Sequence, residues 1–140
     1  MTLIPISFES HGVALDIKYA TQDNFTGKPI YTRPGCYLLD EANNHLKKAI
    51  ELARIQGWHL LIFDAFRPSE AQFKMWAHTP DSDFLADPNR GSPHSRGGAI
   101  DLTLVETATG RILDMGTSFD AFTPLSFHGS LEVSKKAQEN

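Results

Sequence analysis

The sequence predicts an α+β fold, because segments with the period of a strand and segments with the period of a helix occur in one short chain. Residues 13–19 (VALDIKY) and 99–105 (AIDLTLV) alternate apolar and polar side chains, which is typical of half-buried strands. From Asp40 onward, apolar residues recur every third or fourth position, as they do along one face of a helix. The 140 residues are enough for a single domain, 1–140, with one core.

The first half of the chain alternates loop, helix and strand. Glycines and prolines punctuate residues 24–35, which we expect to form a loop. The helix that begins near Asp40 is predicted to stop at Gly57. Residues 58–66 (WHLLIFDAF) form a short apolar run, which predicts a buried strand.

A second helix is predicted to start at Pro68, since proline is favoured in the first turn of a helix, and to end at Thr79-Pro80. Its inner face is expected to include Ala71, Met75 and either Phe73 or Trp76. Residues 79–93 then form a long loop, and long loops in small domains are often functional. Near the C-terminus, Ser134 is a candidate N-cap for a helix shorter than two turns.

Composition excludes several classes of protein. Hydrophobic residues make up 41% and charged residues 21% of the chain, which are globular values, and no apolar stretch is long enough to span a membrane. The net charge of −4 argues against a nucleic-acid partner. The single cysteine, Cys36, cannot form an internal disulfide and is expected to be packed or idle. Without a signal-peptide pattern at the start, these features predict a cytoplasmic protein.

His94 and Asp101 are the first candidate site residues. They stand seven apart in SPHSRGGAID, and glycines between them allow the loop to fold back so that both side chains reach one point. The alternation of the following strand places Asp101 on the side opposite Ile100 and Leu102. An imidazole and a carboxylate are suitable zinc ligands, but the same spacing also fits a simple loop hydrogen bond.

Arg67, in DAFRP, lies between a predicted buried strand and a helix. A guanidinium fixed by both elements suits the stabilisation of a developing oxyanion. Its alternative role is an ion pair with Asp64 or Glu70 that fixes the junction.

Other polar residues allow more than one interpretation. Asp120, in DMGTSFD, could bind a cationic group of a ligand or cap a turn. Ser92 and Ser95 flank His94, so a Ser-His-Asp triad is conceivable, but no GxSxG motif accompanies it.

SPHSRGGAIDLTL, together with DAFRP, DMGTSFD and DIKYATQDNFTGKPIY, resembles the D-alanyl-D-alanine dipeptidases of the vancomycin-resistance type. These belong to the zinc D,D-peptidases with an SxHxxGxAxD signature, and the resemblance covers most of residues 13–129. It implies a central antiparallel sheet with helices packed on it, and a zinc-dependent hydrolase of the D-alanyl-D-alanine dipeptide. Such an enzyme recycles cell-wall material or deprives vancomycin of its target, and needs no nucleic acid or membrane.

The resemblance also implies a role for each candidate residue. His94 and Asp101 would bind zinc, and Arg67 would stabilise the tetrahedral intermediate. Ser92 would hold the substrate near its C-terminal end. Tyr19 and Asp120 would hold the ammonium of the first D-alanine.

One part of the family pattern is missing. The third zinc ligand and the catalytic glutamate lie in an ExxH element of the family, and no ExxH occurs in these 140 residues. The simplest expectation is a chain that lacks the last strands of the fold, with His128 as a possible substitute ligand. The alternative function is then a catalytically impaired remnant that binds a small peptide or a metal.

Overall fold

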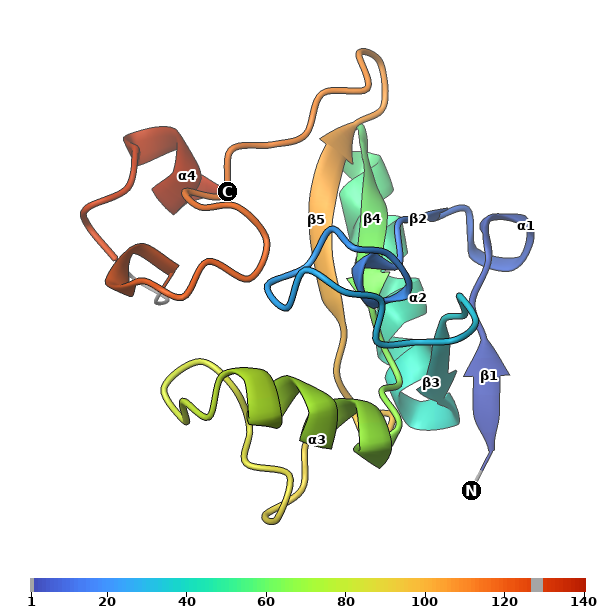
Figure 1. Cartoon of the computed structure of the whole chain (residues 1–140). Coiled ribbons are helices and arrows are strands. Elements are labelled where there is room, and N and C mark those ends of the chain that lie inside the picture. Colours follow the sequence, from blue (N-terminus) through green and yellow to red (C-terminus); the bar gives the residue numbers. More distant parts are fainter. Residues whose placement is uncertain (1, 127–129) are drawn as a thin grey trace.

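A small mixed sheet forms the centre of the molecule in the computed structural model, which describes residues 2–126 and 130–140 (Figure 1). Its strands are ordered β2-β4-β5, and β4 pairs antiparallel with β5 but parallel with β2. A separate antiparallel pair joins β1 to β3. The strands are β1 (Leu3–Pro5), β2 (Ala14–Leu15), β3 (Tyr37–Leu39), β4 (Trp58–Asp64) and β5 (Asp101–Glu106). The predicted α+β class is confirmed.

The long α2 lies along one face of this sheet, and the other helices lie further from it (Figure 1). The α-helices are α1 (Phe8–His11), α2 (Asp40–Ile55), α3 (Ser69–His78) and α4 (Lys135–Glu139), with short 3-10 turns η1 (Lys18–Ala20) and η2 (Pro124–Ser126). As predicted, α2 is followed closely by Gly57, which has a φ of 80°. The Ser134 hydroxyl caps α4 by accepting a hydrogen bond from the backbone N–H of Ala137 at 3.0 Å.

Two predicted elements differ in detail. The expected strand 13–19 is reduced to β2, because only Ala14 and Leu15 find partners on β4 and the chain then turns into η1. On α3 the buried side chains are Ala71, Gln72 and Met75, whereas Phe73 is 48% exposed. Of the two candidates for the inner face, Trp76 is the one that packs against the buried residues.

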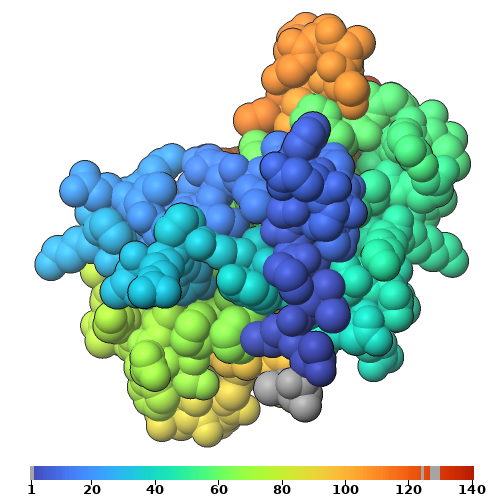
Figure 2. All heavy atoms as spheres, turned by 90° about the vertical axis from the view of Figure 1, so that its right-hand side faces the viewer, coloured from blue at the N-terminus to red at the C-terminus, as the bar shows by residue number. Residues whose placement is uncertain are grey.

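The main core fills the space between α2, the sheet and the N-terminal segment. Its buried side chains include Leu46 and Ala53 of α2 and Leu60 and Ile62 of β4. Figure 2 shows the N-terminal segment (blue) beside α2 (green) on this side of the molecule. The Nε2 atom of His11 lies 2.6 Å from the buried Asn43 Oδ1, which ties the end of α1 to α2.

The pairing of β4 with β5 has an irregularity that matters for the site. Ile62 pairs with Leu102, but the next residue of β5, Asp101, pairs with Asp64 rather than with Phe63. Opposite residues of a ladder share a face, and successive residues of β5 alternate between faces. Asp64 therefore lies on the face of Asp101, away from Ile62 and α2, although simple alternation would place it beside Ile62. Extra residues of this kind commonly redirect a side chain beside a functional site.

Cys36 is 3% exposed within the core, as expected for a packed cysteine. Burial, with a contribution from the charge of Asp64, raises the pKa of its thiol to about 12. In the described part of the chain, no helix has the length and apolar character needed to cross a membrane.

Candidate active site

Four polar side chains meet on the sheet face opposite α2. Asp64 ends β4, and Arg67 lies three residues further along the chain. His94 lies in the turn before β5, and Asp101 begins β5. The backbone fixes these segments together, because the Arg67 N–H donates to the His94 carbonyl at 3.0 Å. Residues far apart in the sequence are thus held at one end of the β4–β5 ladder.

His94 and Asp101 converge as the sequence predicts. The Nε2 atom of His94 lies 3.3 Å from Oδ1 of Asp101. The Nδ1 atom of His94 lies 2.8 Å from the Ala65 carbonyl oxygen, which can only accept, so Nδ1 carries the proton of the neutral ring. In that tautomer, Nε2 and the carboxylate oxygen present lone pairs to each other. A cation between them, either a proton or a metal ion, resolves this repulsion.

The electrostatics of His94 reflect the same arrangement. Burial lowers the pKa of the imidazole, but the hydrogen bond and the negative charge of Asp101 raise it by more, so the net shift is upward. The pair is still accessible, since the His94 side chain is 14% exposed and the Asp101 side chain 29%. This corner of the site therefore attracts positive charge that can arrive from solvent.

Asp64 and Arg67 form a deeper layer. The Asp64 Oδ2 atom accepts a hydrogen bond from the Arg67 Nε at 2.9 Å, and a terminal guanidinium nitrogen forms an ion pair with the same oxygen at 2.8 Å. Tyr31 donates its hydroxyl to the other oxygen, Oδ1, at 2.6 Å. Burial raises the pKa of Asp64, although Arg67 and Tyr31 both oppose that shift. The pair with Asp64 that was considered for Arg67 is present, whereas the alternative partner, Glu70, is exposed.

The ion pair with Asp64 does not remove Arg67 from the site. A terminal nitrogen of its guanidinium also lies 3.4 Å from Asp101 Oδ2, and another donates to Gln72 Oε1 at 2.7 Å. Arg67 is 4% exposed, and carboxylate and amide groups hold its guanidinium on several sides. A guanidinium fixed in this way needs little reorganisation when negative charge develops nearby.

Asp64, His94 and Asp101 together form the one group of potential metal ligands found among residues 2–126 and 130–140, with ligand atoms within 4.8 Å of one another. Both oxygens of Asp64, however, are occupied by Tyr31 and Arg67. The ligand atoms that Arg67 and Tyr31 leave free are the Nε2 of His94 and the Oδ1 of Asp101. This donor set suits a borderline divalent ion such as zinc.

Tyr19 and Asp120 lie beside this centre. The Tyr19 hydroxyl donates a hydrogen bond to Asp120 Oδ2, and the Arg67 guanidinium stands over the Tyr19 ring, 5.0 Å from its centroid. Tyr19 is 1% exposed, so its position is fixed. Burial raises the pKa of Asp120 to about 6, despite the hydrogen bond from Tyr19 that lowers it. Asp120 therefore accepts a hydrogen bond from a tyrosine that is distant in the sequence, and its role is not limited to closing a local turn.

The serines do not form a catalytic triad. Ser92 is 2% exposed, and its hydroxyl accepts a hydrogen bond from the backbone N–H of His94 at 3.2 Å, not from the ring. Ser95 Oγ is buried without a hydrogen-bond partner in the described part of the chain. Neither hydroxyl is therefore positioned to be deprotonated by His94, which argues against a serine nucleophile.

Gly97 explains why the stretch between His94 and Asp101 has so few side chains. Its φ is 76°, a left-handed conformation that favours glycine. A Cβ at this position would lie 3.0 Å from Leu39 Cγ and 3.1 Å from Leu3 Cδ2. The turn thus packs its bare backbone against β1 and β3, which fixes the loop that carries His94.

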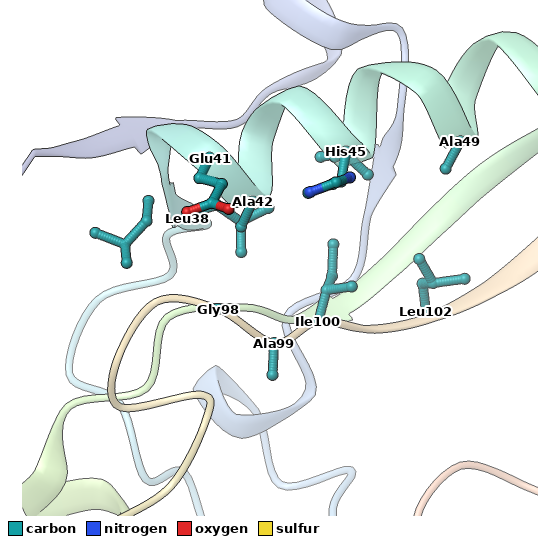
Figure 3. A pocket seen from close by; sticks show the side chains of 11 residues that line it. Leu38, Glu41, Ala42, His45, Ala49, Gly98, Ala99, Ile100 and Leu102 are labelled. Carbon is teal, nitrogen blue, oxygen red and sulfur yellow. The ribbon is translucent and has the colours of Figure 1, made fainter.

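A hollow lies on the opposite face of the sheet. A groove of about 430 Å³ runs between α2 and the start of β5, with Ala42 and His45 on one side and Ile100 and Leu102 on the other (Figure 3). Asp101 and His94 do not line it. The groove is mostly apolar and is separate from the polar centre described above.

Sequence comparison decides the family. The profile of the peptidase M15 family, described as D-ala-D-ala dipeptidase, matches residues 2–140. The chain belongs to this family. Its relatives include the D-alanyl-D-alanine dipeptidases of Escherichia coli K12, with 44% identity over 126 residues, and of Enterococcus faecium, with 40% identity over 153 residues. The corresponding protein of Streptomyces coelicolor is 34% identical over 149 residues.

The matches cover most of this M15 chain but less of each relative. They include 90% of the chain and 65% of the E. coli protein, and 93% of the chain and 74% of the E. faecium protein. The chain thus spans about two thirds to three quarters of the length of these relatives. His128, considered above as a substitute ligand, lies outside the described residues.

Sequence reasoning missed two supporting residues. Gln72 binds Arg67 and also donates to the Ala86 carbonyl at 2.7 Å, and Tyr31 binds Asp64. Tyr31 is 33 residues from Asp64 in the sequence, Gln72 links Arg67 to the loop at Ala86, and no periodicity marks either contact. The one available signal was a polar residue beside Ala71 on the inner face of α3.

Proposed function

We propose that this chain carries the metal- and substrate-binding centre of a zinc-dependent D-alanyl-D-alanine dipeptidase. The observation that carries the proposal is the Nε2 atom of His94 facing the Asp101 carboxylate at 3.3 Å, next to a buried guanidinium. The names of the relatives support the same substrate. His94 and Asp101 would hold the zinc ion. When bound, zinc polarises a carbonyl and lowers the pKa of a water molecule.

The residues around this centre then have distinct tasks. Arg67 stabilises negative charge as the peptide carbonyl becomes an oxyanion. Asp120 provides a carboxylate for the substrate ammonium, and Tyr19 holds that carboxylate through its hydroxyl. Ser92, buried next to His94, binds the substrate near its C-terminal end. A site with an anion placed for a free amine favours a dipeptide over longer peptides.

A second candidate function rests on the ligand count. Catalytic zinc sites usually have three protein ligands, and a general base is also needed. His94 and Asp101 provide two ligands, and no ExxH element occurs in the 140 residues. The second candidate is therefore a domain that binds zinc or the dipeptide without hydrolysing it efficiently. A cytoplasmic location remains a prediction from the single cysteine.

Zinc binding tests the metal site that both candidates can share, and hydrolysis separates the two candidates. We expect the purified chain to bind zinc, as measured by calorimetry. The variants His94→Ala and Asp101→Asn should each lose this binding. His45→Ala is the matched control, because His45 is exposed on α2 at the other face of the sheet. Unchanged zinc binding in His94→Ala would overturn the proposed metal site.

Hydrolysis of D-alanyl-D-alanine by the 140-residue chain should be measured beside the E. coli relative. We expect turnover far below that of the relative, because the chain contributes two ligands and no ExxH glutamate. Turnover equal to that of the relative would show that other residues of this chain replace the missing ligand and base.

A further inference from the structure

The segment that carries Asp120 is held by phenylalanine side chains on both sides of it. Phe119 packs on Phe63 of β4, with ring centroids 4.7 Å apart, and on the Tyr19 ring at 5.8 Å. Regular secondary structure does not cover residues 114–123. Hydrogen bonds from Ser134 and Asn140 hold the start of this segment at Asp114, and around Asp120 the ring packing is the main restraint.

Phe122 anchors the other side of the segment. Its ring lies 4.9 Å from that of Phe25 and is stacked on that of Phe84 at 5.3 Å. Phe25 belongs to the loop 24–35 and Phe84 to the long loop 79–93. The three segments thus meet in one aromatic cluster, and each such ring pair adds a modest, orientation-dependent stabilisation.

Asp120 itself has an unusual backbone. Its φ is 55°, the one positive value recorded for a non-glycine residue in the described part of the chain. Such conformations persist where the surroundings enforce them, and they occur often at ligand-binding positions. Here the enforcing contacts are the two rings on either side of Asp120 and the hydrogen bond from Tyr19.

We propose that Phe119 and Phe122 are positioning residues that clamp Asp120 beside Tyr19, and that this clamp makes the site selective for a substrate with a free ammonium group. The inference rests on the proposed dipeptidase function. If the Asp120 carboxylate is held at a fixed distance from His94 and Asp101, the site favours a substrate whose ammonium group can reach Asp120 while the rest of the substrate lies at His94 and Asp101. An N-acylated dipeptide gains nothing from Asp120, so it should be insensitive to the clamp.

Binding of two ligands provides the test. In the zinc-supplemented chain, Phe122→Ala should weaken the affinity for D-alanyl-D-alanine by about fivefold to tenfold, the size expected for losing ring pairs. The affinity for N-acetyl-D-alanyl-D-alanine should not change. Phe122→Tyr keeps the ring and should bind like the wild type. Phe73→Ala is the matched control, because Phe73 is 48% exposed on the outer side of α3.

A double-mutant cycle shows whether Phe122 acts through Asp120. Adding Phe122→Ala to Asp120→Asn should cause no further loss of dipeptide affinity, since the group that the clamp positions is already gone. If Phe122→Ala weakens dipeptide affinity in the Asp120→Asn background as much as it does in the wild type, the proposal is overturned and Phe122 is a general structural residue.

Hydrogen exchange makes the clamp testable without a ligand. Phe122→Ala should accelerate amide exchange in the peptide that contains Asp120, while β4 and α2 keep their protection. Unchanged exchange around Asp120 would contradict the clamp. A wild-type chain that binds no dipeptide would contradict the proposed function instead, and the exchange experiment alone would then decide whether the clamp exists.

Discussion

The Nε2 atom of His94 faces Oδ1 of Asp101 at 3.3 Å, while the opposite nitrogen of the same ring is bound to the Ala65 carbonyl. The second contact fixes the tautomer that makes the first one a cation site. Partners on the far side of a metal-binding histidine commonly orient the ring in this way. Because the partner here is a backbone carbonyl just beyond β4, the orientation of the His94 ring follows from the fold itself.

Removing Asp64 should destabilise the protein strongly. Asp64→Asn leaves the buried Arg67 without its main counter-charge, and breaking a buried pair in this way costs about 3–5 kcal/mol. Urea unfolding would measure this loss.

The surface pair between Glu51 and Arg54 is a matched control. It has the same i,i+3 spacing, but both side chains are more than half exposed. Glu51→Gln should therefore change the free energy of unfolding by no more than about 0.5 kcal/mol. Equal effects of the two substitutions would contradict the buried character of the Asp64–Arg67 layer.

Gly97 and Gly98 offer a second matched comparison. Gly97→Ala places a Cβ against Leu39 and Leu3 in a left-handed backbone, which should cost about 2 kcal/mol or more of unfolding free energy. At Gly98 the nearest atom to an added Cβ is 3.8 Å away. The free energy of unfolding of Gly98→Ala should therefore stay within about 0.5 kcal/mol of the wild-type value. Similar stability of both variants would show that the turn before β5 is not fixed by close packing.

Dipeptide binding should weaken in mild acid. Since burial raises the pKa of Asp120 to about 6, its carboxylate becomes protonated as the pH falls through that value and no longer attracts the substrate ammonium. Calorimetric titrations above and below this pH should show the loss for D-alanyl-D-alanine but not for its N-acetylated form.

The Asp120→Asn variant serves as the control for this pH effect. It should bind the free dipeptide weakly at every pH, because an amide cannot ionise. If the variant and the wild type lose affinity in parallel, the titrating group is not Asp120.

Cys36 should be unreactive in the folded protein. The thiolate is the reactive form, and a pKa of about 12 leaves almost none of it near neutral pH. A thiol reagent should label the chain slowly under native conditions and completely in denaturant. Rapid labelling of the folded chain would contradict the packing of Cys36 in the core.

Much of the fold followed from local pattern. The period of α2 and the apolar run of β4 are properties of continuous segments, so the sequence predicted both elements close to their bounds. The length of β2 was overestimated, because it depends on how many residues pair with β4 in the folded protein. The alternation of β5 also predicted that Asp101 lies opposite the apolar side chains that face α2.

The site was harder to predict than the fold. The meeting of His94 and Asp101 follows from a short loop and strand parity, which are local. The position of Asp64 depends on an irregular pairing between strands, and Tyr31 and Gln72 support the site through individual side-chain hydrogen bonds. Such contacts depend on tertiary packing, which leaves no periodic signal in the chain. The pairing of Tyr19 with Asp120 was accessible only through the family resemblance.

The irregular step between Ile62 and Asp64 has an evolutionary consequence. If residues 62–64 alternated regularly along β4, the Asp64 carboxylate would instead turn inward, toward the apolar layer under α2. Arg67 would lose its anchor at the same time. The irregular pairing at this step should therefore be kept in homologous proteins, while insertions and deletions accumulate in their surface loops.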